Sequence, residues 1–202
     1  MKYINEGDFL MSGIFIFMAI VLVALIIIFY NLYTQLIMKR NKVKEAMSGI
    51  DVQLNKRYSL IPNILTIANR FMEHERDLLE GITELRTRAA SIKATDATIS
   101  EKIQLDNQIA SKMGQLFVSV ENYPQLKSDQ TMVQAMQTYS EVEEHIAAAR
   151  RFYNSAVNEL NNAVEIFPSS FVASMINIQA YPFFEASEDA KKEVNAADYF
   201  KK

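Results

Sequence analysis

The chain has 202 residues, a formal net charge of −3 from 21 basic and 24 acidic side chains, and no cysteine. This length suits one domain with an anchor, and the lack of cysteine excludes disulfides, thiolate metal sites and cysteine nucleophiles. The charge balance argues against nucleic acid as a partner, which would need a clustered basic excess. Only five glycines and four prolines favour long helices over many short strands.

The first predicted element is a membrane-spanning helix. Residues 9–38 include no charged side chain, and most of them are apolar. As a helix, the apolar part spans roughly 30 Å, the thickness of a bilayer's hydrocarbon core. A cleaved signal peptide fits poorly, because the run is too long and no small-x-small site follows it. We therefore expect an uncleaved transmembrane helix over residues 10–33, after a short extracytoplasmic N-terminus over residues 1–9.

Basic residues on one side of this helix predict its orientation. Only Lys2 precedes the span, whereas four basic residues follow it closely: Lys39, Arg40, Lys42 and Lys44. Lysine and arginine are retained on the cytoplasmic side, so this cluster is a topology signal. We expect a single-pass protein of the cell (inner) membrane, integral to the lipid, with its N-terminus outside. Residues 34–186 would then form a cytoplasmic helical bundle.

A seven-residue apolar repeat follows the span and is typical of coiled-coil packing. Counted from Val43, twelve of fourteen core positions are apolar, which predicts that helices pack on helices. The core positions are Val43, Met47, Ile50, Leu54, Arg57, Ile61, Ile64, Ala68, Phe71, Glu75, Leu78, Ile82, Leu85 and Ala89. Pro62 lies within this stretch and predicts a kink or break near residues 58–61, because it removes one helical hydrogen bond.

A second helix is predicted after a turn at residues 93–97. Thr98 and Glu101 have the spacing of a capping box, and the pair Tyr123-Pro124 ends the helix. One face of this helix is apolar. Its residues are Ile99, Ile103, Met113, Phe117 and Val120.

A third helix is predicted to begin near Ser128 and to end or turn at Pro168. A short apolar helix follows over about residues 169–178, and residues 187–202 form a polar tail. The third helix has an apolar face with steps of three and four. This face comprises Met132, Met136, Tyr139, Val142, Ile146, Ala149, Tyr153, Ala156, Leu160, Ala163 and Phe167. The predicted fold is all-α, a transmembrane helix that continues into an up-and-down antiparallel bundle.

Several separated phrases form a recognisable set. They are NKVKEAMSGIDVQLNKRYSLIPN at residues 41–63, ENYPQL at 121–126, IAAARRFYN at 146–154 and YPFFEA at 181–186. Together with His74-Glu75 and Phe167-Pro168, they resemble the LemA family of bacterial membrane proteins over nearly the whole chain. The resemblance implies an N-terminal anchor followed by a helical bundle, with no catalytic residue and no cofactor.

Three positions depart from the family pattern. Met47 stands where a tryptophan is common, and Ser59 where an aspartate is common. Leu160 precedes Asn161 where an aromatic residue is often found. These departures weaken residue-level inference at those positions, but the family assignment rests on the other motifs.

The sequence predicts neither a catalytic site nor a metal site. A di-iron bundle needs a glutamate three residues before each histidine, but Phe71 and Val142 stand there before His74 and His145. There is also no glycine-rich phosphate loop and no nucleophile elbow. We therefore expect a protein that is not an enzyme and that has no cofactor.

Polar residues on the apolar faces are the remaining candidates for function. Arg57 and Glu75 occupy core positions, where a charge must find a partner. On one continuous helix they would lie roughly 27 Å apart, so they cannot pair with each other. Arg150 is a possible partner for Glu75, and Asn154 and Asn161 lie on one flank of the third helix. These residues form either a structural polar network that fixes helix register or a recognition surface for a partner protein.

The leading hypothesis is a membrane-anchored, non-catalytic scaffold that acts at the inner face of the membrane. We expect it to assemble as a homo-oligomer and to bind a protein partner whose identity the sequence does not give. The alternative is a membrane-remodelling or envelope-stress protein that acts on lipid through its bundle. A signalling relay is a weaker hypothesis, because about ten residues outside the membrane give it little to sense with. An enzyme is the weakest.

Overall fold

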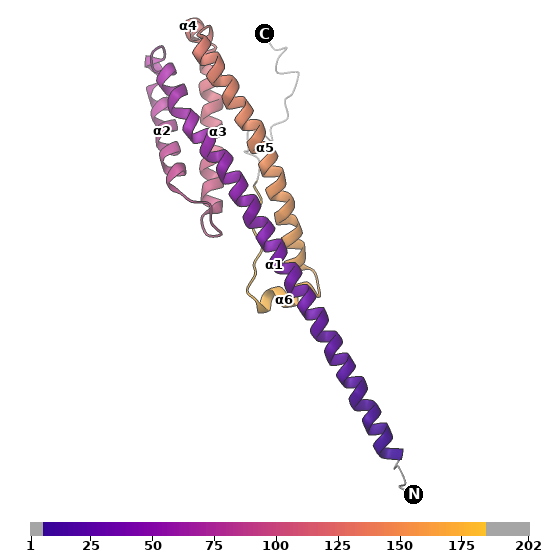
Figure 1. The fold of residues 1–202 in the computed structure, drawn as a ribbon. Helices are drawn as coiled ribbons and strands as arrows, with labels where there is room; N and C mark the ends of the chain where they lie inside the picture. The colour runs from indigo at the N-terminus through magenta and orange to yellow at the C-terminus, as the bar shows by residue number, and fades with distance from the viewer. Residues whose placement is uncertain (1–5, 185–202) are drawn as a thin grey trace, which may run out of the picture. The chain divides into compact units, whose positions relative to one another are not determined.

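In the computed structural model, which describes residues 6–184, every regular element is helical (Figure 1). The all-α prediction with an N-terminal transmembrane helix is confirmed. The predicted polar tail over residues 187–202 lies outside the described residues, as do residues 1–5 of the predicted extracytoplasmic segment. The boundaries at residues 9, 33 and 186 stay predictions.

Helix α1, Glu6–Ala68, is 63 residues long. Its N-terminal part is the one helix among the described residues that is long and apolar enough to cross a membrane. Side chains from Met11 to Asn31 are exposed, as expected when lipid rather than protein surrounds them. The seven-residue repeat then begins, and all its predicted core positions from Val43 to Ala68 are buried.

Pro62 does not break α1, which continues for six residues beyond it. Proline has no N–H, so the carbonyl of Tyr58 loses its usual partner four residues later. Arg86 replaces that partner, because its Nε–H donates to the Tyr58 carbonyl oxygen at 2.9 Å. Of the two outcomes predicted near residues 58–61, a kink or a break, the break is therefore excluded, and a side chain from another helix satisfies the freed carbonyl.

The first repeat is divided between two helices instead of following one. Helix α1 ends at Ala68, and a turn leads to the short 3-10 helix η1, Glu73–Glu75, and to α2, Arg76–Ser91. The turn closes when the backbone N–H of Phe71 and that of Met72 both donate to the Ala68 carbonyl. In α2, Ile82, Leu85 and Ala89 are buried as predicted, whereas Leu79 is buried in place of the predicted Leu78.

Helix α3, Ile99–Val120, is followed by the short α4, Pro124–Lys127. The predicted capping box does not form, because Thr98 makes no side-chain bond to the helix. Its hydroxyl donates instead to the Lys93 carbonyl at 2.5 Å and accepts the Thr95 backbone N–H at 3.1 Å. The preceding turn uses the hydroxyl that the box would need. Of the predicted apolar face, Phe117 is half-buried and the other four residues are buried.

Helix α5, Gln130–Glu165, begins after Asp129, whose carboxylate accepts the Met132 N–H at 3.0 Å. Most of its predicted face is buried, including Met132, Tyr139, Val142, Ile146, Tyr153, Ala156 and Leu160. Met136, Ala149 and Ala163 are half-buried, whereas Phe167 lies beyond the helix and is 81% exposed. Helix α6, Ser169–Met175, is shorter than predicted.

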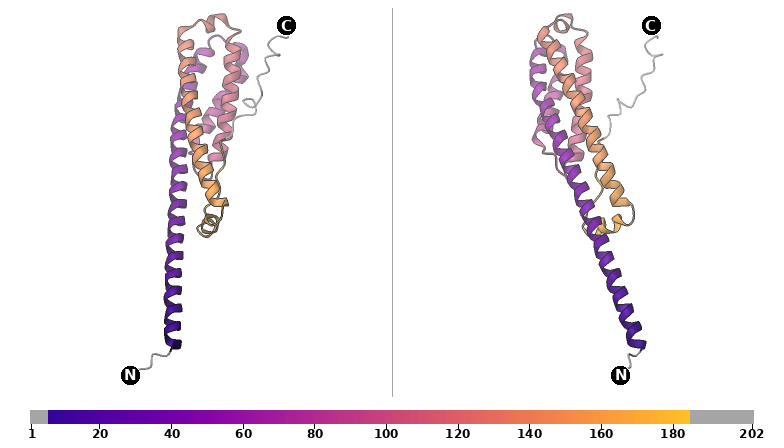
Figure 2. Two further views of the ribbon diagram at one scale, coloured as in Figure 1. Left: turned by 90° about the vertical axis from the view of Figure 1, so that its right-hand side faces the viewer. Right: turned by 45° about the vertical axis from the view of Figure 1, so that its right-hand side comes forward.

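Two compact units divide the described chain. The membrane-span unit comprises residues 6–42 and 158–180, and it includes the span and α6. The bundle unit comprises residues 43–157 and 181–184, in which parts of α1 and α5 run beside α2 and α3 (Figures 1 and 2). Short turns join consecutive helices, which gives the bundle unit the predicted up-and-down arrangement.

Candidate functional site

The bundle unit has a buried carboxylate at its centre. Asp106 of α3 is fully buried. Its Oδ1 accepts a hydrogen bond from Arg57 Nη1 of α1 at 2.5 Å. Its Oδ2 accepts one from Arg150 Nη2 of α5, also at 2.5 Å. One carboxylate therefore joins three helices through charge-assisted bonds, which are among the strongest hydrogen bonds in proteins.

A second carboxylate completes this cluster. Glu143 of α5 is paired with Arg57, whose side chain is fully buried. The Arg57 guanidinium also lies 5.7 Å from the ring centre of Tyr139, a cation–π distance. Two arginines and two carboxylates have no net charge together. We call Arg57, Asp106, Glu143 and Arg150 the charge network.

Lys102 forms a separate buried ion pair. Its ammonium is paired with Asp51 of α1 and donates to the Ile92 carbonyl at 2.8 Å. It also lies 5.8 Å from the ring centre of Tyr58. Only 1% of Lys102 is exposed, so a lysine without these partners would be strongly destabilising there. The pair ties the end of α2 to α1 and α3.

Tyrosines around these charges stay protonated at physiological pH. Burial raises the pKa of the Tyr58 hydroxyl, and the nearby Asp106 carboxylate raises it further. Burial likewise raises the pKa of Tyr139 to about 12, although the Arg57 guanidinium lowers it in part. The pKa of Tyr153 is raised to about 12 by burial and by Asp96. None of these hydroxyls is poised to act as a base near pH 7.

The C-terminal segment is fastened to the bundle beside the charge network. The Asn154 side chain donates to the Phe184 carbonyl at 2.9 Å and accepts the Phe184 N–H at 2.8 Å. The Tyr153 hydroxyl donates to the Pro182 carbonyl at 3.0 Å. The Arg150 guanidinium lies 4.4 Å from the Phe184 ring centre. These contacts hold residues 181–184, the YPFF phrase, against the bundle. We call this segment the strap.

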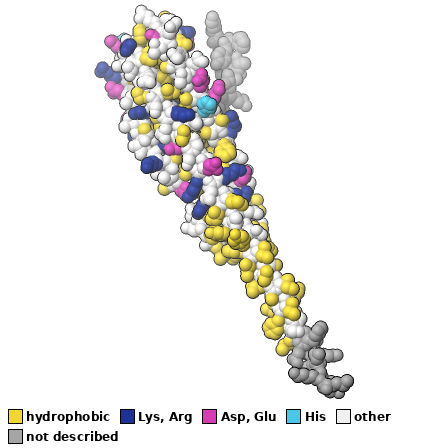
Figure 3. Space-filling view, in the orientation of Figure 1, with side chains coloured by type: hydrophobic (Ala, Val, Ile, Leu, Met, Phe, Trp, Pro, Cys, Tyr) yellow, Lys and Arg dark blue, Asp and Glu magenta, His cyan; other side chains and the backbone are white. Residues whose placement is uncertain are grey.

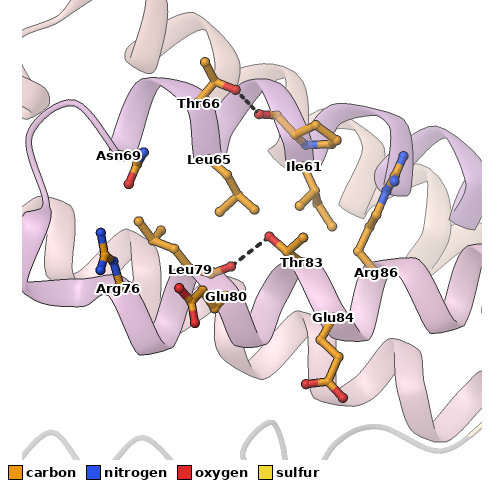
Figure 4. Close-up of a pocket in the computed structure, with 11 residues that line it drawn as sticks. Ile61, Leu65, Thr66, Asn69, Arg76, Leu79, Glu80, Thr83, Glu84 and Arg86 are labelled. Atoms are coloured by element: carbon orange, nitrogen blue, oxygen red, sulfur yellow. Dashed lines mark hydrogen bonds between the residues drawn. The ribbon is translucent and has the colours of Figure 1, made fainter.

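An open groove lies between α1 and α2. It has a volume of about 850 Å³. Ile61 and Leu65 on one side and Leu79 on the other point between the two helices (Figure 4). The charged residues at its rim are Arg76, Glu80, Glu84 and Arg86. An apolar floor with a polar rim is the usual anatomy of a protein-binding surface.

The family model of the LemA family matches residues 46–197. The chain belongs to the LemA family. It is 26% identical over 175 residues to the protein LemA of Metamycoplasma hominis, which covers 85% of this chain and 78% of that relative. The resemblance seen in the sequence motifs is thereby confirmed. The matched region includes the whole charge network and the strap.

In this LemA-family chain, the predicted polar residues are only partly brought together. Arg57 and Arg150 meet at Asp106, and Asn154 holds the strap next to them. Glu75 lies half-buried in η1, and Arg150, considered as its possible partner, is paired with Asp106 instead. The turn after Ala68 removes Glu75 from the helix on which its core position was predicted. Asn161 is half-buried in the membrane-span unit.

The partners of these arginines are not among the residues predicted from the sequence. Asp106 nevertheless carries a detectable signal, because Ile99, Asp106, Met113 and Val120 are spaced by seven residues. This spacing places an acidic side chain in the core stripe of α3. Lys102 carries the same signal, because Lys102, Ile109 and Leu116 are also spaced by seven residues, whereas Glu143 lies beside the stripe of α5.

Three of the four predicted topology residues make ion pairs in the structure. In the membrane-span unit, Lys42 and Lys39 lie 2.9 and 3.7 Å from the Glu159 carboxylate. In the bundle unit, Lys44 lies 3.4 Å from Asp96. The hydrogen bond and charge of Lys42 lower the pKa of Glu159, with a smaller effect from Lys39. Arg40 is half-buried.

The two histidines are exposed. Among residues 6–184, no three side chains of the usual metal-ligand types lie close enough to hold an ion.

Chemically, the charge network is well suited to fix helix register. Both oxygens of Asp106 are already bonded to arginines, which leaves this carboxylate poorly placed to accept a substrate proton.

Proposed function

We propose that this protein is a membrane-anchored, non-catalytic scaffold that assembles at the inner face of the cytoplasmic membrane. The observation that carries the proposal is the groove between α1 and α2, which is open, has accessible apolar side chains at the exposed Pro62 and the half-buried Leu65, and is charged at its rim. The buried charges of the bundle unit are matched with one another, so they serve the fold, and the groove is available to a partner.

The groove favours a helical protein segment as its occupant. Two facing helices with an apolar floor accept the apolar side of a third helix, as in other helix-in-groove complexes. Arg76 and Arg86 with Glu80 and Glu84 give the rim both signs of charge, which suits a mixed-charge protein surface better than nucleic acid. The occupant would be a helix of a second copy or of another protein.

Cysteine crosslinking tests this proposal directly. The chain has no cysteine, so Thr66→Cys at the groove introduces a single thiol. In intact cells, a thiol-linked photocrosslinker at this position should capture a defined adduct, and mass spectrometry would show whether it is a second copy. The matched control is Val118→Cys on α3, which is 70% exposed and outside the groove. Equal capture from both sites, or none from either, would refute the scaffold.

The cytoplasmic placement of the bundle belongs to the same proposal. It is supported by the basic residues that follow the span, Lys39, Arg40, Lys42 and Lys44. A reporter that is active only in the cytoplasm, fused after Lys202, should be active. Activity of a periplasmic reporter alone would reverse the orientation and move the scaffold to the other face.

A further inference from the structure

An apolar surface surrounds the turn between α5 and α6 in the membrane-span unit. Ile166, Phe167, Phe171 and Met175 are all at least 60% exposed, and Phe167 reaches 81%. Soluble proteins rarely expose a contiguous group of large apolar side chains, and such a patch marks a contact with protein or membrane. We call these four residues the apolar turn.

The apolar turn lies against the span itself. A groove of about 410 Å³ is lined on one side by Leu25, Phe29 and Leu32 of α1. On the other side it is lined by Phe167, Phe171 and Val172. In the space-filling view, hydrophobic side chains gather along the N-terminal span, where no charged side chain is seen (Figure 3). The patch is thus continuous with the lipid-facing surface of α1.

Distance along α1 places this contact within the bilayer. Phe29 precedes Lys39 by ten residues, or about 15 Å of helix. Lys39 and Lys42 pair with Glu159 of α5, and this ion pair marks the aqueous side. Because the hydrocarbon core is about 30 Å thick, side chains packed beside Phe29 lie at the depth of the acyl chains in the nearer leaflet.

The sequence and the backbone of this segment suit lipid. No charged residue occurs between Glu165 and Glu185. Backbone groups in lipid must be satisfied internally, and several here are: the N–H of Ser170 donates to the Ile166 carbonyl, and that of Ile178 to the Ala173 carbonyl. The Ser169 hydroxyl also donates to the Ile166 carbonyl.

We propose that the apolar turn is a second membrane element, inserted among the acyl chains of the leaflet that faces the bundle. The groove between α6 and the span is occupied by lipid chains. This inference goes beyond the scaffold and holds for either orientation of the protein. The inserted turn would anchor α5 as well as α1, so the chain is attached to the membrane at two points.

Tryptophan fluorescence tests the insertion in the full chain. The protein has no tryptophan, so Phe171→Trp gives a single reporter. The variant is reconstituted into phosphatidylcholine vesicles with plain or brominated acyl chains. Brominated chains should quench its emission to within about twofold of Phe17→Trp in the span, and aqueous iodide should have little effect. The matched control is Phe152→Trp in the bundle unit, 51% exposed, which iodide should quench and brominated lipid should not.

A second reporter, Met175→Trp, guards against a local disturbance at position 171. If both reporters respond to iodide as Phe152→Trp does, the turn lies in water and the proposal is wrong. If brominated lipid quenches them only after the vesicles are diluted with excess lipid, a second copy covers the patch, and the proposal is wrong in that case too. Agreement of both reporters with Phe17→Trp at every lipid ratio supports it.

Discussion

The two units of this protein place their side chains in opposite ways. In the membrane-span unit, apolar side chains from Met11 to Tyr30 and at the apolar turn are exposed. In the bundle unit, the charged side chains of Arg57, Lys102 and Asp106 are buried. Each arrangement is reasonable only in its own surroundings, because lipid solvates apolar groups, whereas a buried charge needs an opposite charge beside it.

This difference indicates where each unit is vulnerable. An apolar side chain on the span can be shortened without opening a cavity, since lipid takes up the space. A charged side chain in the bundle cannot be removed alone, because its partner would stay buried and unpaired. Substitutions of the same type in the two units should therefore have very different effects on unfolding.

The largest effect is expected at Asp106. Asp106→Ala leaves Arg57 and Arg150 without the carboxylate that joins them and should destabilise the full chain by about 3 to 5 kcal/mol. Urea unfolding in detergent micelles, followed by circular dichroism, would measure this. The control Asp96→Ala removes an exposed partner of Lys44 and should change stability by less than about 1 kcal/mol. A loss of stability in Asp106→Ala as small as that in Asp96→Ala would mean that the charge network is dispensable.

A matched pair of leucines compares the two units directly. Leu54 is buried in the bundle unit and Leu22 is 60% exposed on the span. Leu54→Ala should destabilise unfolding in micelles by about 2 to 5 kcal/mol, because it leaves a cavity. Ile146→Ala, at an equally buried site of α5, should act similarly. Leu22→Ala should have almost no effect. A loss at Leu22 like that at Leu54 would show that protein, and not lipid, covers the span.

Arg86→Ala should cause a smaller loss of stability, and the size of this loss should depend on whether residue 62 is proline. Arg86→Ala removes the donor to the Tyr58 carbonyl, and an unsatisfied buried carbonyl costs about 1 to 3 kcal/mol. Pro62→Ala restores a backbone N–H to the same carbonyl. Arg86→Ala should therefore be much less destabilising in the Pro62→Ala background. Additive effects in this double-mutant cycle, measured by urea unfolding, would refute the replacement.

The smallest effect should come from Glu159 and should depend on pH. Lys42 lowers the pKa of this carboxyl below its ordinary value of 4.5. A lowered folded-state pKa stabilises above the unfolded value, and the stabilisation is lost as pH falls through the folded value. At pH 6 to 7, above the ordinary carboxyl pKa of about 4.5, the difference in melting temperature between the natural chain and Glu159→Gln should thus be constant. The difference should disappear in more acidic solution. In a Lys42→Met background, the difference should be nearly absent at every pH.

Local patterns were enough to predict the helical class, the span and the core positions of α1. Each depends on residues close in sequence, such as the seven-residue spacing from Val43 to Ala68. The turn after Ala68 could not be predicted, because residues 69–72 include neither glycine nor proline. Glu75 was misplaced for this reason, and Glu75→Ala should now have little effect on stability.

The partners in the charge network could not be predicted either. Arg57 and Asp106 are 49 positions apart, and their meeting depends on how α1 and α3 are aligned along their axes. That alignment follows from the packing of whole faces and cannot be derived from the pattern of either helix alone. The strap is similar, since Asn154 bonds the backbone N–H and carbonyl of Phe184, which any residue except proline could supply.

The bridge at Asp106 also limits how the bundle can move. Its two oxygens hold arginines from two different helices at 2.5 Å. A piston-like step of α1 past α3 by one helical turn, about 5.4 Å, would separate Arg57 from Asp106 and leave both charges buried alone. A signal carried along α1 by such sliding is therefore incompatible with an intact bridge, and α1, α3 and α5 should shift together as one body.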